Sequence, residues 1–224
     1  MANGKLKLPA ARLIVVAAIA GVLAGGVAVY VTGGYFGNNT GGLAADTGAD
    51  ACAAKAEAAK LVAASAGGDV AAMLAADPPQ SLQSLAFNGP DGQAMTLADR
   101  TGKTLLVNLW ATWCAPCRAE MPALDQLQQA KGGNSFEVVA INVDTGDDVK
   151  PKKFLADTRV KTLAYYRDAS MGAFNMLKER ALALGLPVTL LVDPQGCLVA
   201  AMNGPANWSG PDAARLIDAA LAAK

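Results

Sequence analysis

The chain has 224 residues, of which 53% are hydrophobic and 17% charged, and its 19 basic residues balance its 19 acidic ones. This balance provides no basic surface for nucleic acid, so we expect no nucleic-acid partner. Histidine is absent, which excludes Ser-His-Asp and Cys-His catalysis as well as sites in which histidine ligates zinc or copper.

Residues 13–31 form an uncharged apolar run of 19 residues, enough for a helix that crosses about 30 Å of hydrocarbon. A buried core helix is one alternative, but no polar face interrupts the run. A cleaved signal peptide is another. The run is longer than the usual apolar region of such a peptide, and Ala18 and Ala20 would place the cleavage inside it. We therefore expect an uncleaved transmembrane anchor over 13–31.

Charges on either side of this run predict its orientation. Residues 1–12 contain Lys5, Lys7 and Arg12, and no basic residue follows the run before Lys55. The positive-inside rule then places residues 1–12 in the cytoplasm as a short tail. We expect a single-pass protein of the bacterial inner membrane, with the rest of the chain in the periplasm.

Two segments separate the anchor from the main domain. Residues 32–49 are rich in Gly, Asn and Thr, which predicts a flexible linker. Residues 50–80 are rich in alanine and predict a helical extension. Its first helix is expected over 51–66 and its second over 69–76, which stops before two prolines.

Residues 81–224 alternate between strand and helix patterns and predict one α/β domain. The expected strands are 82–87, 95–97, 105–110, 136–143, 188–192 and 198–202, and the expected helices are 114–130, 152–159, 173–184 and 211–223. The order strand, helix, strand over 105–143 implies a parallel crossover. Turn residues between the early strands and between the late strands imply hairpins, so the sheet is expected to be mixed.

The segment 110–118 reads WATWCAPCR and carries the clearest chemical signal. It places Cys-x-x-Cys where a buried strand ends and a helix begins, so free backbone N–H groups and the helix dipole favour the thiolate of Cys114. Cys117 lies one turn further on the same face, close enough for a disulfide. Half of a zinc site is the alternative, but zinc needs four ligands and the chain has no second Cys-x-x-Cys. We therefore expect a redox pair, with no metal and no cofactor.

Thiol–disulfide exchange gives the two thiols different roles. Cys114 is the expected nucleophile, which forms a mixed disulfide with a partner protein. Cys117 is the expected resolving thiol, which attacks that mixed disulfide and releases the reduced partner. We expect Trp113 and the body of the helix to shield Cys117.

The sequence VNLWATWCAPCRAEMP resembles the active site of the thioredoxin superfamily, and in particular that of its membrane-anchored TlpA-like branch. The similarity extends from residue 81 to the C-terminus and includes NGPDGQAMTLADRTGK, GLPVTLLVDPQG and GPANWSGPDAARLIDAAL. This resemblance implies a thioredoxin fold for 81–224, in which helices flank a central mixed β-sheet.

The resemblance also implies a substrate-binding site made of Trp113, Leu186 and Pro187. Pro187 matches the cis-proline that faces the Cys-x-x-Cys in this superfamily, and the backbone of Leu186 is implied to bind the partner as an added strand. The residues alone favour an ordinary trans bond, because only about 5–6% of X-Pro bonds are cis.

The chain departs from ordinary thioredoxins at two buried positions, where Asn108 replaces an Asp and Ala140 lies near the place of a Lys. Asn108 cannot titrate, and we expect it to satisfy buried backbone by a hydrogen bond. Glu120, one turn after Cys117, is the nearest acidic candidate for handling protons. A position on a solvated helix face is the alternative for Glu120.

The residues between the two cysteines indicate the direction of electron flow. Strongly oxidising members of the superfamily usually carry a histidine there, whereas Ala115-Pro116 resembles the Gly-Pro of reducing thioredoxins. We therefore predict a reductase. The TlpA-like resemblance implies that its substrates are cysteine pairs that bind copper, in oxidase subunit II or in its Sco-type metallochaperone. Electrons are implied to come from a DsbD- or CcdA-like membrane donor.

Two other functions stay open at this point. One is reduction of apocytochrome c before haem attachment, although members with that role usually have Pro-Glu where this chain has Pro187-Val188. The other is a Sco-like copper-binding assembly factor, which would share the fold and the anchor. Such a protein should carry Cys-x-x-x-Cys and a distant histidine, and this chain has neither.

Cys52 and Cys197 lie outside the redox pair. Because leftover cysteines usually pair in an oxidising compartment, we predict a structural Cys52–Cys197 disulfide that joins the extension to the main domain. Two separate buried thiols are the alternative, since cysteine is also a common small core residue.

Overall fold

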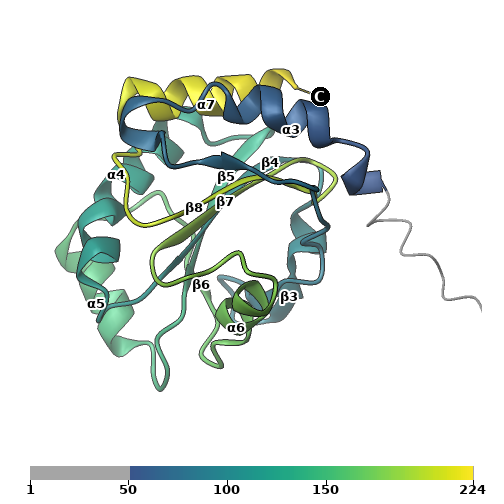
Figure 1. Ribbon diagram of the computed structural model, residues 1–224. Helices are drawn as coiled ribbons and strands as arrows, with labels where there is room; N and C mark the ends of the chain where they lie inside the picture. Colours follow the sequence, from purple (N-terminus) through teal and green to yellow (C-terminus); the bar gives the residue numbers. More distant parts are fainter. Residues whose placement is uncertain (1–50, 224) are drawn as a thin grey trace, which may run out of the picture. The chain divides into compact units, whose positions relative to one another are not determined.

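Figure 1 shows the computed structural model, which describes residues 51–223. The predicted cytoplasmic tail, anchor and linker lie outside the described residues, and so does the first residue of the predicted extension. Within the described part of the chain, no helix combines the length and the apolar character that a membrane crossing requires. The anchor therefore stays a prediction.

Eight strands of the described residues form one sheet, in the order β1-β8-β7-β4-β5-β6-β2-β3. They are β1 (Leu74–Ala75), β2 (Ala86–Asn88), β3 (Ala94–Thr96), β4 (Thr104–Trp110), β5 (Phe136–Asn142), β6 (Tyr166–Arg167), β7 (Val188–Val192) and β8 (Leu198–Asn203). β4 is parallel to β5 and antiparallel to β7, so the sheet is mixed, as expected. Both predicted hairpins are present, as β2–β3 and β7–β8, although β2 covers Ala86–Asn88 rather than the expected 82–87.

The central strands β4, β5 and β7 are buried over their whole length. Their sequences are nearly continuous apolar runs, because a strand that is covered on both faces needs apolar residues on both sides. Asn108 in β4 and Thr189 in β7 are polar exceptions, and both are fully buried. These two residues belong to the site described below.

Helices cover the faces of the sheet (Figure 1). They are α3 (Ala56–Ala63), α4 (Ala115–Lys131), α5 (Val149–Asp157), α6 (Gly172–Glu179) and α7 (Pro211–Ala222). α3 lies beside α7 and packs against β8, so the described part of the predicted extension belongs to the folded body. α4 follows β4 directly and starts at the Cys-x-x-Cys, as the sequence predicts.

The predicted helix over 69–76 is wrong. Gly68–Val70 form a single 3-10 turn, and Leu74–Ala75 form β1, which pairs antiparallel with β8. Alanine favours a helix locally, but the outer edge of β8 offers unpaired backbone groups. Pairing with that edge decides the conformation of this segment.

The predicted helix over 173–184 ends early, at Glu179. Ala181 has a φ of 57°, in the left-handed region of backbone conformation. A right-handed helix cannot continue through a residue in this conformation. The chain then folds back, and the Leu182 N–H donates to the Leu177 carbonyl at 2.8 Å. The residues freed from the helix form the loop that leads into β7.

β6 was not expected from the sequence, because two residues are too few for an alternating pattern. Its Tyr166 is buried, and the hydroxyl donates to Glu137 Oε1 at 2.5 Å. β6 connects the central strands to the β2–β3 hairpin. Helix α5 also begins three residues earlier than predicted, at Val149 rather than Lys152.

Candidate active site

Cys114 and Cys117 form a disulfide, with their Cα atoms 5.3 Å apart. Cys114 is the N-cap of α4, and its sulfur accepts a hydrogen bond from the Cys117 N–H at 3.2 Å. Pro116 lies in the first turn of the helix, where a backbone N–H would have no partner within the helix, so the missing N–H of proline costs no hydrogen bond. In the reduced protein this N–H and the amino end of the helix dipole would stabilise a negative charge on the Cys114 sulfur.

The two cysteines differ slightly in exposure even in the disulfide. The Cys114 residue keeps 5% of its surface exposed and Cys117 none. Both cysteines pack in the hydrophobic core, and Cys117, inside α4, is the more buried of the two. Trp113 is 64% exposed, which leaves its ring available to a partner.

The turn between β4 and α4 is fixed by Asp144. The Thr112 N–H and the Thr112 hydroxyl each donate to this carboxylate at 2.9 Å. The carboxylate also accepts from Asn142 Nδ2 at 2.8 Å. Because Thr112 is two residues before Cys114, these bonds hold the backbone that presents the disulfide.

The Leu186–Pro187 bond is cis, the geometry that the resemblance implied. Val188 lies opposite Leu109 in the antiparallel β4–β7 pair. Pro187 therefore lies at the end of the sheet where β4 finishes and the active-site turn begins. The structure thus brings Pro187 to the same end of the sheet as Trp113 and the two cysteines. The Asp77–Pro78 bond is also cis, which the sequence did not predict.

A buried carboxyl group lies one turn beyond Cys117. Glu120 is 3% exposed, so its predicted alternative position on a solvated helix face is wrong. One oxygen accepts from Asn108 Nδ2 at 2.8 Å, and the other accepts from the Ala206 N–H and Trp208 Nε1, both at 3.1 Å. Burial raises the pKa of Glu120 to about 7, although these three hydrogen bonds favour the carboxylate.

Asn108 does not satisfy backbone groups, contrary to the prediction. Its side-chain amide donates to Glu120 and to the Thr189 hydroxyl, the latter at 2.9 Å, while its own carbonyl oxygen has no partner. The sequence identified Asn108 and Glu120 but gave no signal for Thr189 or Trp208. These two residues come from β7 and from the segment before α7, and only the folded chain brings them to the site.

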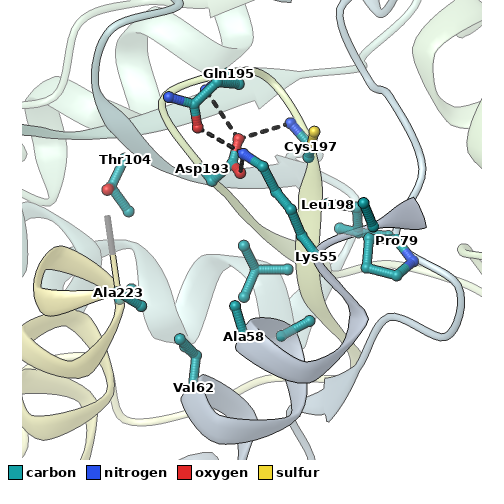
Figure 2. A pocket seen from close by; sticks show the side chains of 14 residues that line it. Lys55, Ala58, Val62, Pro79, Thr104, Asp193, Gln195, Cys197, Leu198 and Ala223 are labelled. Carbon is teal, nitrogen blue, oxygen red and sulfur yellow. Dashed lines mark hydrogen bonds and ion pairs between the residues drawn. The ribbon is translucent and has the colours of Figure 1, made fainter. Parts of the chain in front are cut away.

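Cys52 and Cys197 also form a disulfide, the pairing that the sequence predicts. It joins residues 145 positions apart, and both cysteines are buried. Beside it, Lys55 pairs with Asp193 and donates to Gln195 Oε1 at 2.7 Å. Figure 2 shows these side chains at one end of a cavity of about 290 Å³, which residues of α3 line along one side.

Among residues 51–223, no group of three or more potential metal ligands is clustered. The disulfide lies at the amino end of the helix that follows a central strand, and a cis-proline lies at the same end of the sheet. These features define a thiol:disulfide oxidoreductase of the thioredoxin fold. The chain belongs to the Redoxin family, whose sequence pattern matches residues 78–217.

Known proteins of this class are similar to the chain. The thiol-disulfide oxidoreductase ResA of Bacillus thuringiensis subsp. konkukian is 27% identical over 114 residues, which cover 51% of this chain and 62% of that protein. The thioredoxin-like protein YneN of Bacillus subtilis is 43% identical over 68 residues, or 30% of this chain and 39% of that protein. The chain thus spans less than two thirds of the length of these curated relatives.

A solved structure supports the fold assignment. A protein from Chlorobium tepidum, assigned as the thiol:disulfide interchange protein DsbE, superposes with a TM-score of 0.55 and is 26% identical. The superposition covers 64% of this chain and 96% of that protein. The predicted thioredoxin fold is therefore confirmed for the described domain.

Proposed function

We propose that this protein is a membrane-anchored periplasmic reductase of protein disulfides, of the TlpA-like branch. The observation that carries the proposal is the Cys114 sulfur at the amino end of α4, where it accepts the Cys117 N–H. In the dithiol form, the Cys114 thiolate attacks one sulfur of a partner disulfide. A bond forms between the two proteins, and the partner's other sulfur leaves as a thiolate.

The second step uses Cys117. Its thiolate attacks the Cys114 sulfur, the mixed disulfide breaks, and the partner leaves with both cysteines reduced. The two electrons come from the Cys114–Cys117 dithiol, which ends as the disulfide that the structure contains. A membrane donor of the DsbD or CcdA type would restore the dithiol, in keeping with the predicted anchor at 13–31.

We propose that Glu120 handles the proton of the resolving thiol. It lies three residues after Cys117 in α4, so both side chains are on one face of the helix, and both are buried. A carboxyl group with a pKa of about 7 exchanges protons near neutral pH. Its carboxylate would accept the Cys117 proton as that thiol attacks.

The proposed substrates are cysteine pairs that bind copper, in oxidase subunit II or in a Sco-type metallochaperone. Support comes from the TlpA-like sequence of the site and from Pro187-Val188, where Pro-Glu is usual in proteins that reduce apocytochrome c. The absence of histidine from the whole chain argues against copper delivery as its own role.

Trapping in cells tests the proposal. In full-length protein, Cys117→Ser removes the resolving thiol, so Cys114 should hold its partners in mixed disulfides that mass spectrometry identifies. Cys114→Ser is the matched control and should trap nothing. Capture of oxidase subunit II or a Sco-type protein supports the proposed substrates, and capture of apocytochrome c favours the alternative. Reduced protein that retains Cu(I) after desalting, with no trapped partner, would instead identify a copper-binding factor.

A further inference from the structure

The loop between α6 and Pro187 is clamped by the side chain of Asn203. Its Oδ1 accepts a hydrogen bond from the Leu184 N–H at 2.7 Å. Its Nδ2 donates to the Leu182 carbonyl at 3.1 Å. One side-chain amide thus bonds both a backbone N–H and a backbone carbonyl of the loop, on residues two positions apart. These two bonds fix the path of the chain from Leu182 to Leu184.

Bonds at both ends of the loop complete this support. At its start, Arg180 Nη1 donates to the Ser81 carbonyl at 2.8 Å. At its end, the Gly204 N–H donates to the Pro187 carbonyl at 2.9 Å. Asn203 is the last residue of β8, directly before Gly204. A loop held at its two ends and in its middle loses little entropy when a partner binds.

The side chain that this clamp presents is apolar and points into solvent. Leu184 is 85% exposed, more than any other large apolar side chain of the described residues. It lies three residues before Pro187, and its N–H donates to Asn203, which pairs with Val188 at the end of the sheet where β4 leads to Cys114. Leucine gains free energy by removing apolar surface from water, so a leucine on a rigid loop at this end of the sheet suits an apolar partner group.

We propose that Leu184 is a specificity-determining residue that contacts an apolar side chain next to the reactive cysteine of the partner polypeptide, and that Asn203 is the positioning residue that holds Leu184 there. This inference rests on the proposed reaction with protein disulfides. The resemblance to thioredoxins implies that in this reaction the partner lies extended along Leu186. Leu184 lies two residues further from Pro187, where it would contact a residue flanking the partner cysteine.

The test compares two synthetic peptides that each contain one internal disulfide. In one peptide leucine flanks the reactive cysteine on both sides, and in the other serine does. Reduced full-length protein in detergent is mixed with each peptide, and the second-order rate constant of peptide reduction is measured by acid quench. Hydroxyethyl disulfide, which is too small to reach the loop, measures the basal reactivity of Cys114.

We expect the native protein to reduce the leucine peptide about tenfold faster than the serine peptide. Leu184→Ser should lower this ratio about fivefold, because the contact of a partly buried leucine is lost. Leu184→Met should keep the ratio, because it keeps the apolar surface. Leu61→Ser, which alters another exposed leucine on α3, should also keep it. None of these variants should change the rate with hydroxyethyl disulfide.

Asn203→Ala tests the clamp separately. It should slow reduction of the leucine peptide about fivefold without changing the rate with hydroxyethyl disulfide, and combination with Leu184→Ser should add little further loss. An unchanged peptide ratio in Leu184→Ser would overturn the inference, and so would equal rates for the two peptides with the native protein. A native protein that reduces hydroxyethyl disulfide but neither peptide would contradict the proposed function itself.

Discussion

The indole Nε1–H of Trp208 donates a hydrogen bond to Glu120 Oε2 at 3.1 Å, inside the protein. This bond ties the segment before α7 to the active-site helix. On the other side of the carboxyl group, Asn108 in β4 donates to Oε1. Glu120 is thus held from both sides, one turn after the resolving cysteine. Since burial opposes its charge, its protonation is linked to the stability of the fold.

The first prediction concerns the stability of the oxidised protein between pH 4.5 and 7. The pKa of Glu120 rises from an ordinary value of 4.5 to about 7 on folding. In this range Glu120 loses its proton in the unfolded chain but keeps it in the folded protein. The contribution of protonated Glu120 to the stability of the fold is therefore full below pH 4.5 and is lost as the pH rises to 7. The free energy of unfolding should fall by about 3 kcal/mol from this group. Urea unfolding at several pH values measures it.

Glu120→Gln is the matched variant, because glutamine does not titrate. It should be less stable than the native protein at pH 4.5 by about 1–3 kcal/mol, since its amide NH₂ cannot accept from the donors that face the carboxylate. Its stability should vary less with pH over this range. The same pH slope in both proteins would show that Glu120 has an ordinary pKa.

The second prediction concerns the reactivity of the two active-site thiols. In the reduced protein, Cys114 should react with iodoacetamide at least about tenfold faster than Cys117 near neutral pH. Cys114 lies at the helix terminus and keeps a small exposed surface, whereas Cys117 lies inside the helix and keeps none. Peptide mapping after a brief pulse of reagent measures both rates. Faster labelling of Cys117 would reverse the two assigned roles.

The third prediction concerns the direction of electron flow. Because Ala115-Pro116 separates the cysteines and no histidine is present, the reduction potential should lie nearer to that of thioredoxin, about −270 mV, than to that of DsbA, about −120 mV. Equilibration with dithiothreitol and glutathione buffers measures it, with the Cys52→Ala/Cys197→Ala variant as a control that should give the same value. A potential near that of DsbA would point to an oxidant or an isomerase.

The fourth prediction concerns the disulfide between Cys52 and Cys197. The pair closes a loop with a sequence separation of 145, for which chain entropy gives up to about 5 kcal/mol of stabilisation. Replacing both cysteines by alanine should lower the free energy of unfolding by several kcal/mol. The matched variant Cys114→Ala/Cys117→Ala opens a loop with a separation of 3 and should cost about 2 kcal/mol or less.

Mass mapping of the untreated protein gives a direct check of the same pairing. Cys52 and Cys197 should be recovered in one cross-linked peptide pair. A mild reductant should open the Cys114–Cys117 bond first, because catalytic disulfides are more easily reduced than structural ones. Free thiols at Cys52 and Cys197 in protein from the periplasm would contradict the prediction.

The sequence predicted the fold well where patterns are local and strong. The continuous apolar runs of β4, β5 and β7 and the turn residues of the two hairpins identify most of the sheet, and α4 and α7 begin within a residue of their predicted starts. The weak points were short or edge elements. β1 and β6 have two residues each, and their conformation follows from the strands beside them rather than from their own side chains.

The active-site chemistry was determined by the sequence itself, because Cys-x-x-Cys after a buried strand fixes both the disulfide and its place at a helix terminus. The surroundings of the site were decided by tertiary structure. Trp208 reaches Glu120 from 88 residues away, and Asn203 holds Leu184 from 19 residues away. Burial of Glu120 depends on the sheet and helices that enclose it, and hydrogen bonds between distant segments leave no periodic pattern in the chain. Sequence determines which groups are present, and packing determines which of them meet without water between them.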